Sequence, residues 1–154
     1  MEPVARQLSF SVMVLLSLCG MIACAQPPPP AAPPVFRITL SRAGGFTGMA
    51  TGYHLQSDGT LIAWRRALAQ EEQVNWTHKY APDEVRRWAE DLQGAVHGWQ
   101  SGETGNMTTR LEFARDDSVR AWTWAGTGAP AQAPKAVGEW LQEFDRFARE
   151  AAAK

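Results

Sequence analysis

The sequence predicts an α+β domain in which two amphipathic helices pack on one face of an antiparallel sheet. Three observations carry this prediction. Several segments alternate apolar and polar residues, short polar turns join neighbouring segments of this kind, and two longer segments repeat apolar residues with helical spacing. The predicted order over residues 35–154 is ββββαββα, and hairpins combined with helices favour one sheet that carries both helices on the same face.

Four strands are predicted before the first helix, over residues 35–40, 51–57, 61–68 and 74–80. Alternation in the first strand places Phe36, Ile38 and Leu40 on one face. The pair Asp58–Gly59 favours a tight hairpin turn between the second and third strands, because Asp-Gly tolerates the positive φ of such a turn. In the fourth strand we expect four residues to share a face: Val74, Trp76, His78 and Tyr80.

Two helices and a second hairpin complete the predicted domain. The first helix is expected over residues 81–94, because Pro82 suits a first helical turn and Gly94 a helix end. Its apolar stripe comprises Val85, Trp88, Ala89 and Leu92. The hairpin strands 107–115 and 118–126 flank a turn at two aspartates, and the last helix begins near Pro134. The stripe of that helix comprises Val137, Trp140, Leu141, Phe144 and Phe147 or Ala148.

Residues 1–23 predict an export signal of the bacterial lipoprotein type. Arg6 supplies a positive start, and residues 8–23 are nearly all apolar and uncharged, a stretch shorter than a membrane-spanning helix needs. Cys24 follows Met-Ile-Ala and is the expected lipidation site, because it would be the single cysteine left after processing. Cleavage at an ordinary A-x-A site, giving a soluble secreted or periplasmic protein, is the alternative, and an uncleaved anchor is a third reading.

Residues 24–34 are interpreted as the lipidated cysteine followed by a proline-rich tether, AQPPPPAAPP. Proline fixes φ and removes amide donors, so such a run favours an extended polyproline helix. At about 3.1 Å per residue the tether would span roughly 30 Å. The sequence therefore predicts a protein of the bacterial cell envelope, attached to the membrane by lipid, with one folded domain over residues 35–154.

Charge and motifs argue against nucleic-acid binding, catalysis and cofactor binding. The 15 Lys and Arg residues nearly balance the 16 Asp and Glu residues, without a basic stripe. The three histidines lack metal-ligand spacing. Residues 98–102, GWQSG, place serine fourth, whereas a nucleophile elbow needs it third. We therefore expect no catalytic residue, no metal and no cofactor.

Residues 41–53, SRAGGFTGMATGY, carry the strongest functional signal. The stretch lacks the Lys-Ser/Thr of a phosphate-binding P-loop, and a strand rather than a helix is predicted to follow. It is best read as a turn between two strands that contains one large apolar residue, Phe46. Exposed aromatic residues dominate many interfaces, so we favour an outward Phe46 that anchors a partner over the alternative in which it points inward to the sheet. The proposed binding residues are Gly44, Gly45, Phe46, Thr47, Gly48 and Met49.

Two of the seven tryptophans support an alternative function. The other five fall on predicted core positions: Trp76, Trp88, Trp122, Trp124 and Trp140. Trp64 precedes two arginines, and Trp99 lies in a Gly-rich loop. If exposed, both would stack on sugar rings in a glycan or cell-wall binding lipoprotein; if folded back, they would pack on their own domain. A structural lipoprotein without a discrete ligand is a further alternative.

The predicted elements of this chain are a leading strand that runs into SRAGGFTG, a hairpin, a helix opened by APDEV, a charged hairpin and a final amphipathic helix. This order of elements resembles that of the emfourin family. Emfourins are small protein inhibitors of thermolysin-like metalloproteases, so the resemblance implies a secreted metalloprotease as partner. The residue-specific likeness covers Arg42 to Gly48, as R-x-G-G-F-x-G. The export signal, the tether, the 94–106 loop and the Trp-rich second hairpin depart from the family. We predict a non-catalytic, lipid-anchored binding module.

Overall fold

A computed structural model describes residues 35–154 of the chain. The predicted signal segment, the lipidation site and the tether lie outside the described residues. Eight elements follow one another: β1 (Phe36–Gly44), β2 (Met49–Gln56), β3 (Thr60–Arg66), β4 (Gln73–Lys79), α2 (Pro82–Ala95), β5 (Met107–Arg115), β6 (Ser118–Ala125) and α3 (Lys135–Ala152). This order confirms the predicted α+β class. Within the described part, no helix is long and apolar enough to cross a membrane.

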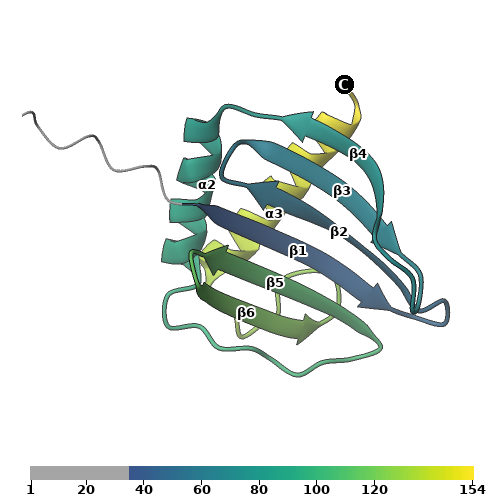
Figure 1. The fold of residues 1–154 in the computed structure, drawn as a ribbon. Helices are drawn as coiled ribbons and strands as arrows, with labels where there is room; N and C mark the ends of the chain where they lie inside the picture. Colours follow the sequence, from purple (N-terminus) through teal and green to yellow (C-terminus); the bar gives the residue numbers. More distant parts are fainter. Residues whose placement is uncertain (1–34) are drawn as a thin grey trace, which may run out of the picture. The chain divides into compact units, whose positions relative to one another are not determined.

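The six strands form one antiparallel sheet with the order β4-β3-β2-β1-β5-β6 (Figure 1). The first four strands form a meander, because each turn is too short to allow any other pairing. The second hairpin, β5–β6, then joins the free side of β1, so that β1 lies in the middle of the sheet. Consequently, the β1–β2 turn, the β3–β4 loop and the start of β5 meet at one end of the sheet (Figure 1).

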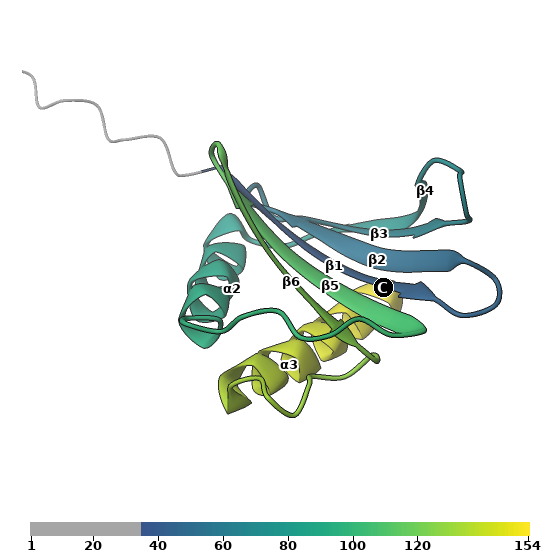
Figure 2. The same ribbon diagram turned by 90° about the horizontal axis from the view of Figure 1, so that it is seen from below.

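Both helices lie on the same face of the sheet, and the other face carries no helix (Figure 2). Ile38, Leu40 and Leu111 point from the strands into this layer and are fully buried. On the helical side Phe144 is buried against Trp140, with the two ring centroids 5.0 Å apart. Burial of such apolar surface supplies about 25 cal/mol per Å², so this layer holds the domain together.

One residue of β4 lies on the face opposite to the predicted one. Ala63 pairs with Trp76, but the next residue, Trp64, pairs with Val74, so Asn75 is an extra residue in β4. Such a β-bulge reverses the alternation of side chains on the bulged strand. Trp76 therefore faces the helices as expected, whereas the prediction for Val74 is wrong: it lies on the helix-free face and is exposed.

Candidate protein-docking site

The stretch 41–53 forms the end of β1, a four-residue turn and the start of β2. The amide of Gly48 donates to the carbonyl oxygen of Gly45 at 3.3 Å, which closes the turn. Phe46 and Thr47 occupy its two corner positions and are exposed. The turn thus joins two antiparallel strands, as the sequence predicts.

Gly44 permits a backbone approach that no other residue allows. Its φ is 127°, and a Cβ added there would collide with the carbonyl oxygen of Asn106. The same oxygen accepts a hydrogen bond from the amide of Gly45 at 3.0 Å. The glycine pair therefore fastens the turn to the segment that precedes β5, and this fixes the direction in which Phe46 projects.

Three exposed apolar side chains, Phe46, Leu68 and Met107, form what we call the rim. Phe46 is fully exposed, Leu68 is 79% exposed and Met107 is 37% exposed. A Cβ added to Gly48 would lie 3.3 Å from Cβ of Leu68, and one added to Gly45 would lie 3.7 Å from Sδ of Met107. Leu68 and Met107 therefore flank the turn on its two sides. Exposed apolar side chains that gather around one turn are typical of contact surfaces.

Among the predicted binding residues, Phe46 and Thr47 lie in the open, while Met49 and the three glycines of the turn are half-buried supports. The predicted outward direction of Phe46 is confirmed. Sequence analysis did not single out Leu68 or Met107, and it assigned Leu68 to a strand that ends at Arg66. The available signal is the meander itself, because the end of a third strand returns to the end of the sheet where the first turn lies.

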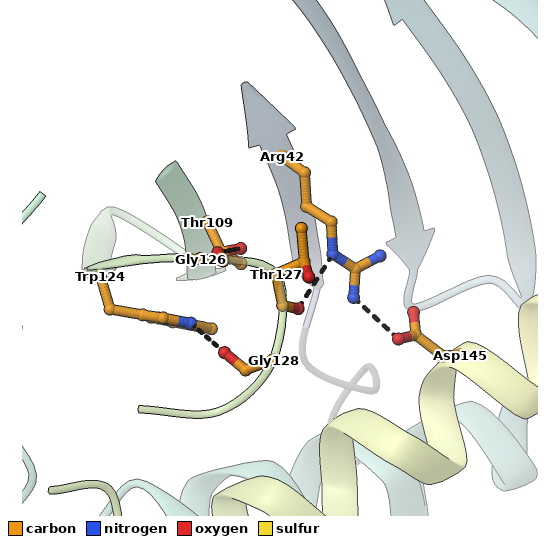
Figure 3. Close-up of polar contacts among 7 residues, drawn as sticks. All are labelled: Arg42, Thr109, Trp124, Gly126, Thr127, Gly128 and Asp145. Atoms are coloured by element: carbon orange, nitrogen blue, oxygen red, sulfur yellow. Dashed lines mark hydrogen bonds and ion pairs between the residues drawn. The ribbon is translucent and has the colours of Figure 1, made fainter. Parts of the chain in front are cut away.

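Arg42 fixes the base of the hairpin to the helical layer (Figure 3). Its Nη2 donates to Oδ2 of Asp145 on α3 at 2.8 Å, and its Nε donates to the carbonyl oxygen of Thr127 at 3.3 Å. Both charged side chains are mostly buried, with exposed fractions of 22% and 31%. Charge-assisted hydrogen bonds in such surroundings are stronger than those between exposed groups. The arginine of the R-x-G-G-F-x-G segment thus acts as a support for the turn.

The loop between β6 and α3 is fixed by side chains that bind three successive carbonyl groups (Figure 3). The hydroxyl of Thr109 donates to the carbonyl of Gly126 at 2.6 Å, and the indole Nε1 of Trp124 donates to that of Gly128 at 2.6 Å. The carbonyl oxygen of Thr127, between these two residues, accepts the hydrogen bond from Nε of Arg42. Thr109 is fully buried, so its hydrogen bond also satisfies a polar group in the core. The support beneath the hairpin is therefore rigid.

Trp64 offers no open aromatic face, so the folded-back reading applies to it and the exposed reading does not. Although it lies on the helix-free face, its side chain is 3% exposed. Its ring lies over Gly52, where an added Cβ would be 2.7 Å from Cζ2, and stacks on His54 with ring centroids 5.5 Å apart. The guanidinium of Arg66 lies 5.8 Å from the ring centroid. An aromatic ring that covers a cross-strand glycine in this way stabilises the sheet.

Trp99 is also folded back onto the domain, with an exposed fraction of 9%. Its ring lies parallel to that of Trp122, with centroids 6.3 Å apart, and its carbonyl accepts the indole hydrogen of Trp122 at 3.1 Å. The following loop attaches to β6, because the amide of Gly102 donates to the carbonyl of Thr123 at 2.9 Å. Since neither tryptophan presents a face to solvent, stacking on a sugar ring has no platform at these two residues.

A hydroxyl, an imidazole and a carboxylate form a chain on the helix-free face. Oγ1 of Thr39 lies 3.0 Å from Nδ1 of His54, and Nε2 of His54 lies 3.0 Å from Oε2 of Glu72. Hydrolytic triads use these groups but also need free donors for an oxyanion. Thr39 lies within β1, whose backbone pairs with strands on both sides. The chain instead ties the β3–β4 loop to the sheet, and within residues 35–154 no cluster of His, Cys, Asp or Glu is arranged to hold a metal.

Comparison with known proteins assigns no family. No protein-family model matches the sequence, and none of the curated proteins matches it. The likeness to emfourins stays a prediction, and the candidate site depends on the geometry of the rim and its supports.

Proposed function

We propose that residues 35–154 form a non-catalytic protein-binding module that docks through the rim, and that its partner is a secreted thermolysin-like metalloprotease. The observation that carries this proposal is the position of Phe46, a fully exposed aromatic residue at the corner of a turn. Aromatic side chains of this kind are frequent hot spots, since they fill a pocket on the partner and lose little conformational entropy.

The supports of the turn favour an inhibitor-like mode of binding. Gly44 and Gly45 hold the turn against the segment before β5, and Arg42 holds the strand below it. A loop that is already ordered before binding loses less free energy on association. Protease inhibitors typically bind with little backbone movement, so a projecting, fixed turn with an apolar corner suits a concave cleft.

Strand β1 separates the turn from the start of the described chain. The described chain begins at Val35, directly before β1, and the turn follows the other end of this nine-residue strand. At about 3.3 Å per residue, the two ends are roughly 26 Å apart. The rim therefore lies at the end of β1 opposite to Val35, where its exposed side chains are available to a partner.

The test measures inhibition of thermolysin by residues 35–154, together with capture of proteins from envelope and secreted fractions. The hydrophobic core lies between Phe36 and Ala151, so this fragment keeps it whole. Replacing Phe46 with alanine is expected to weaken binding by about 30-fold or more, because hot spots contribute about 2 kcal/mol or more. Val119→Ala removes an exposed apolar side chain of β6 outside the turn; it is the matched control and should change affinity less than about threefold.

Thermal unfolding of both variants should match that of the original chain, since each side chain is exposed. Unchanged binding by folded Phe46→Ala protein would contradict docking through the rim. If another protein is captured through Phe46 and thermolysin is not inhibited, the proposal of a binding module is retained. The proposal that its partner is a metalloprotease is then rejected.

A further inference from the structure

The β3–β4 loop, residues 67–72, folds back over the helix-free face of the sheet, where its Glu72 contacts His54, the residue whose ring stacks on the buried Trp64. Figure 2 shows the loop rising on the side away from the helices. Among residues 35–154, Nε1 of Trp64 is the one buried side-chain polar atom without a hydrogen-bond partner. Buried donors of this kind are rare in folded proteins, and each one calls for a physical explanation.

Three other buried indoles of the same domain have a hydrogen-bond partner, in contrast to Trp64. They donate to backbone carbonyl groups: Trp122 at 3.1 Å, Trp124 at 2.6 Å and Trp140 at 3.1 Å. All three lie on the helix-covered side, within the hydrophobic core. The unpaired donor lies instead on the helix-free face, over which a loop rather than a helix folds.

The β3–β4 loop is held weakly. Ala69 has a φ of 58°, a left-handed conformation that is unfavourable for any residue with a Cβ. Glu72 links the loop to His54 by a hydrogen bond at 3.0 Å and to Arg66 by an ion pair at 4.0 Å, but its side chain is 39% exposed, so solvent competes for both contacts. Leu68 is 79% exposed and adds little buried surface to the closed loop.

We propose that residues 67–72 open as a local unit, and that Trp64 then becomes a fourth contact residue of the docking surface. The occupant is an extended segment of the partner protein, one of whose backbone carbonyl groups accepts the indole hydrogen of Trp64. The identity of the occupant rests on the proposed function. The loop connects the region of Trp64 to the rim directly, because its own Leu68 belongs to the rim and lies against Gly48.

Loop opening is tested by hydrogen exchange of the indole N–H groups, followed by NMR on residues 35–154. A Trp64→Phe variant assigns the signal of Trp64. Local opening requires less free energy than global unfolding, so the indole of Trp64 should exchange about 100-fold faster or more than the indoles of the three satisfied tryptophans. Equal exchange rates, as expected if the loop opens only on global unfolding or if a bound water holds the indole, would overturn the proposal.

Two loop variants sharpen this measurement. Glu72→Gln removes the charge that links the loop to the sheet and should accelerate exchange of Trp64 alone. Glu71→Gln is the matched control, because Glu71 makes no ion pair among the described residues; it should leave exchange unchanged. Equal effects of the two variants would show that the link through Glu72 does not hold the loop.

Contact with a partner is tested by adding thermolysin and observing the indole signal of Trp64. We expect this signal to shift on binding, and the folded Trp64→Phe variant to bind about 3- to 10-fold more weakly, as for loss of one hydrogen bond. Binding that depends on Phe46 but leaves the indole signal unchanged would overturn the contact role of Trp64 and retain the proposed function. If thermolysin does not bind, the proposed partner and the contact role both fail, while the exchange rates still decide whether the loop opens.

Discussion

Strand β2 has a hairpin turn at each end, and the two turns use their corner residues differently. At one turn, the carboxylate of Asp58 accepts hydrogen bonds from the amide and the hydroxyl of Thr60 at 2.9 and 3.0 Å, and from Lys79 at 2.8 Å. At the other turn, Phe46 extends into solvent. The first turn shows that this sheet reverses its chain with local polar contacts alone. Chain reversal therefore does not account for the aromatic residue at the second turn.

The largest expected effect comes from a substitution that disturbs the backbone at the β1–β2 turn. Gly44→Ala should lower the free energy of unfolding by about 2–4 kcal/mol, since it combines an unfavourable φ with a collision against a backbone carbonyl. Gly94→Ala is the matched control, because an added Cβ there meets no atom within 4 Å inside α2. It should raise stability by about 0.5–1 kcal/mol. Denaturant unfolding measures both, and similar values for the two variants would contradict the tight approach at Gly44.

A smaller effect is expected when the flanks of the turn are shortened. Leu68→Ala and Met107→Ala should each weaken partner binding by about 1 kcal/mol, roughly fivefold, because residues around a hot spot contribute less than its centre. Val119→Ala removes an exposed apolar side chain of β6 and should leave affinity unchanged. Binding titrations with the captured partner measure all three, and an equal loss for Val119→Ala would show that the contact surface extends beyond the rim.

An effect of similar or smaller size is expected for the ion pair between Arg42 and Asp145. In a double-mutant cycle with alanine at each position, the pair should show a coupling of about 1 kcal/mol in the free energy of unfolding, since both groups are mostly buried. Partner binding should also weaken in either variant, because the base of the hairpin is less fixed. Strictly additive effects on unfolding would mean that the ion pair does not stabilise the hairpin.

The smallest expected effect is a dependence of the free energy of unfolding on acidic pH, and it arises at the turn that contains Asp58. Hydrogen bonds from Lys79 first, and then from Thr60, lower the pKa of Asp58 from 3.8 to about 2. Its stabilising contribution is therefore present above pH 4 and is lost as pH falls towards 2. Because the group is largely exposed, we expect less than about 1 kcal/mol. Asp58→Asn should remove this part of the acid dependence of unfolding while leaving the affinity for the partner unchanged.

The elements of the fold were predictable because each has a local signal. Alternation in VFRITL, the Asp58–Gly59 turn and the helical stripe that contains Phe144 are properties of neighbouring residues, and the structure confirms all three. The outward direction of Phe46 was predictable for the same reason, since a turn of glycines leaves a large side chain no core to enter.

The remaining features depend on contacts between segments that lie far apart. Trp64 is buried on the helix-free face, where its ring lies over Gly52 and against His54 of the neighbouring strand, and no periodicity within β3 encodes these contacts. Val74 changes face because β4 contains one residue more than its partner strand, a property of pairing rather than of either strand. The flanks of the rim, Leu68 and Met107, meet only through the topology of the sheet.

The bulge in β4 has a second consequence, which concerns the two outer strands of the sheet. An edge strand presents unpaired amide and carbonyl groups, on which another chain can extend the sheet into a fibril. In β4 the bulge at Asn75 interrupts the straight run of these groups, and Lys79 adds a charge at its end. On β6, the loop that contains Gly102 already occupies part of the edge. Both edge strands of the sheet thus resist aggregation, β4 through its bulge and β6 through the loop that covers part of its edge.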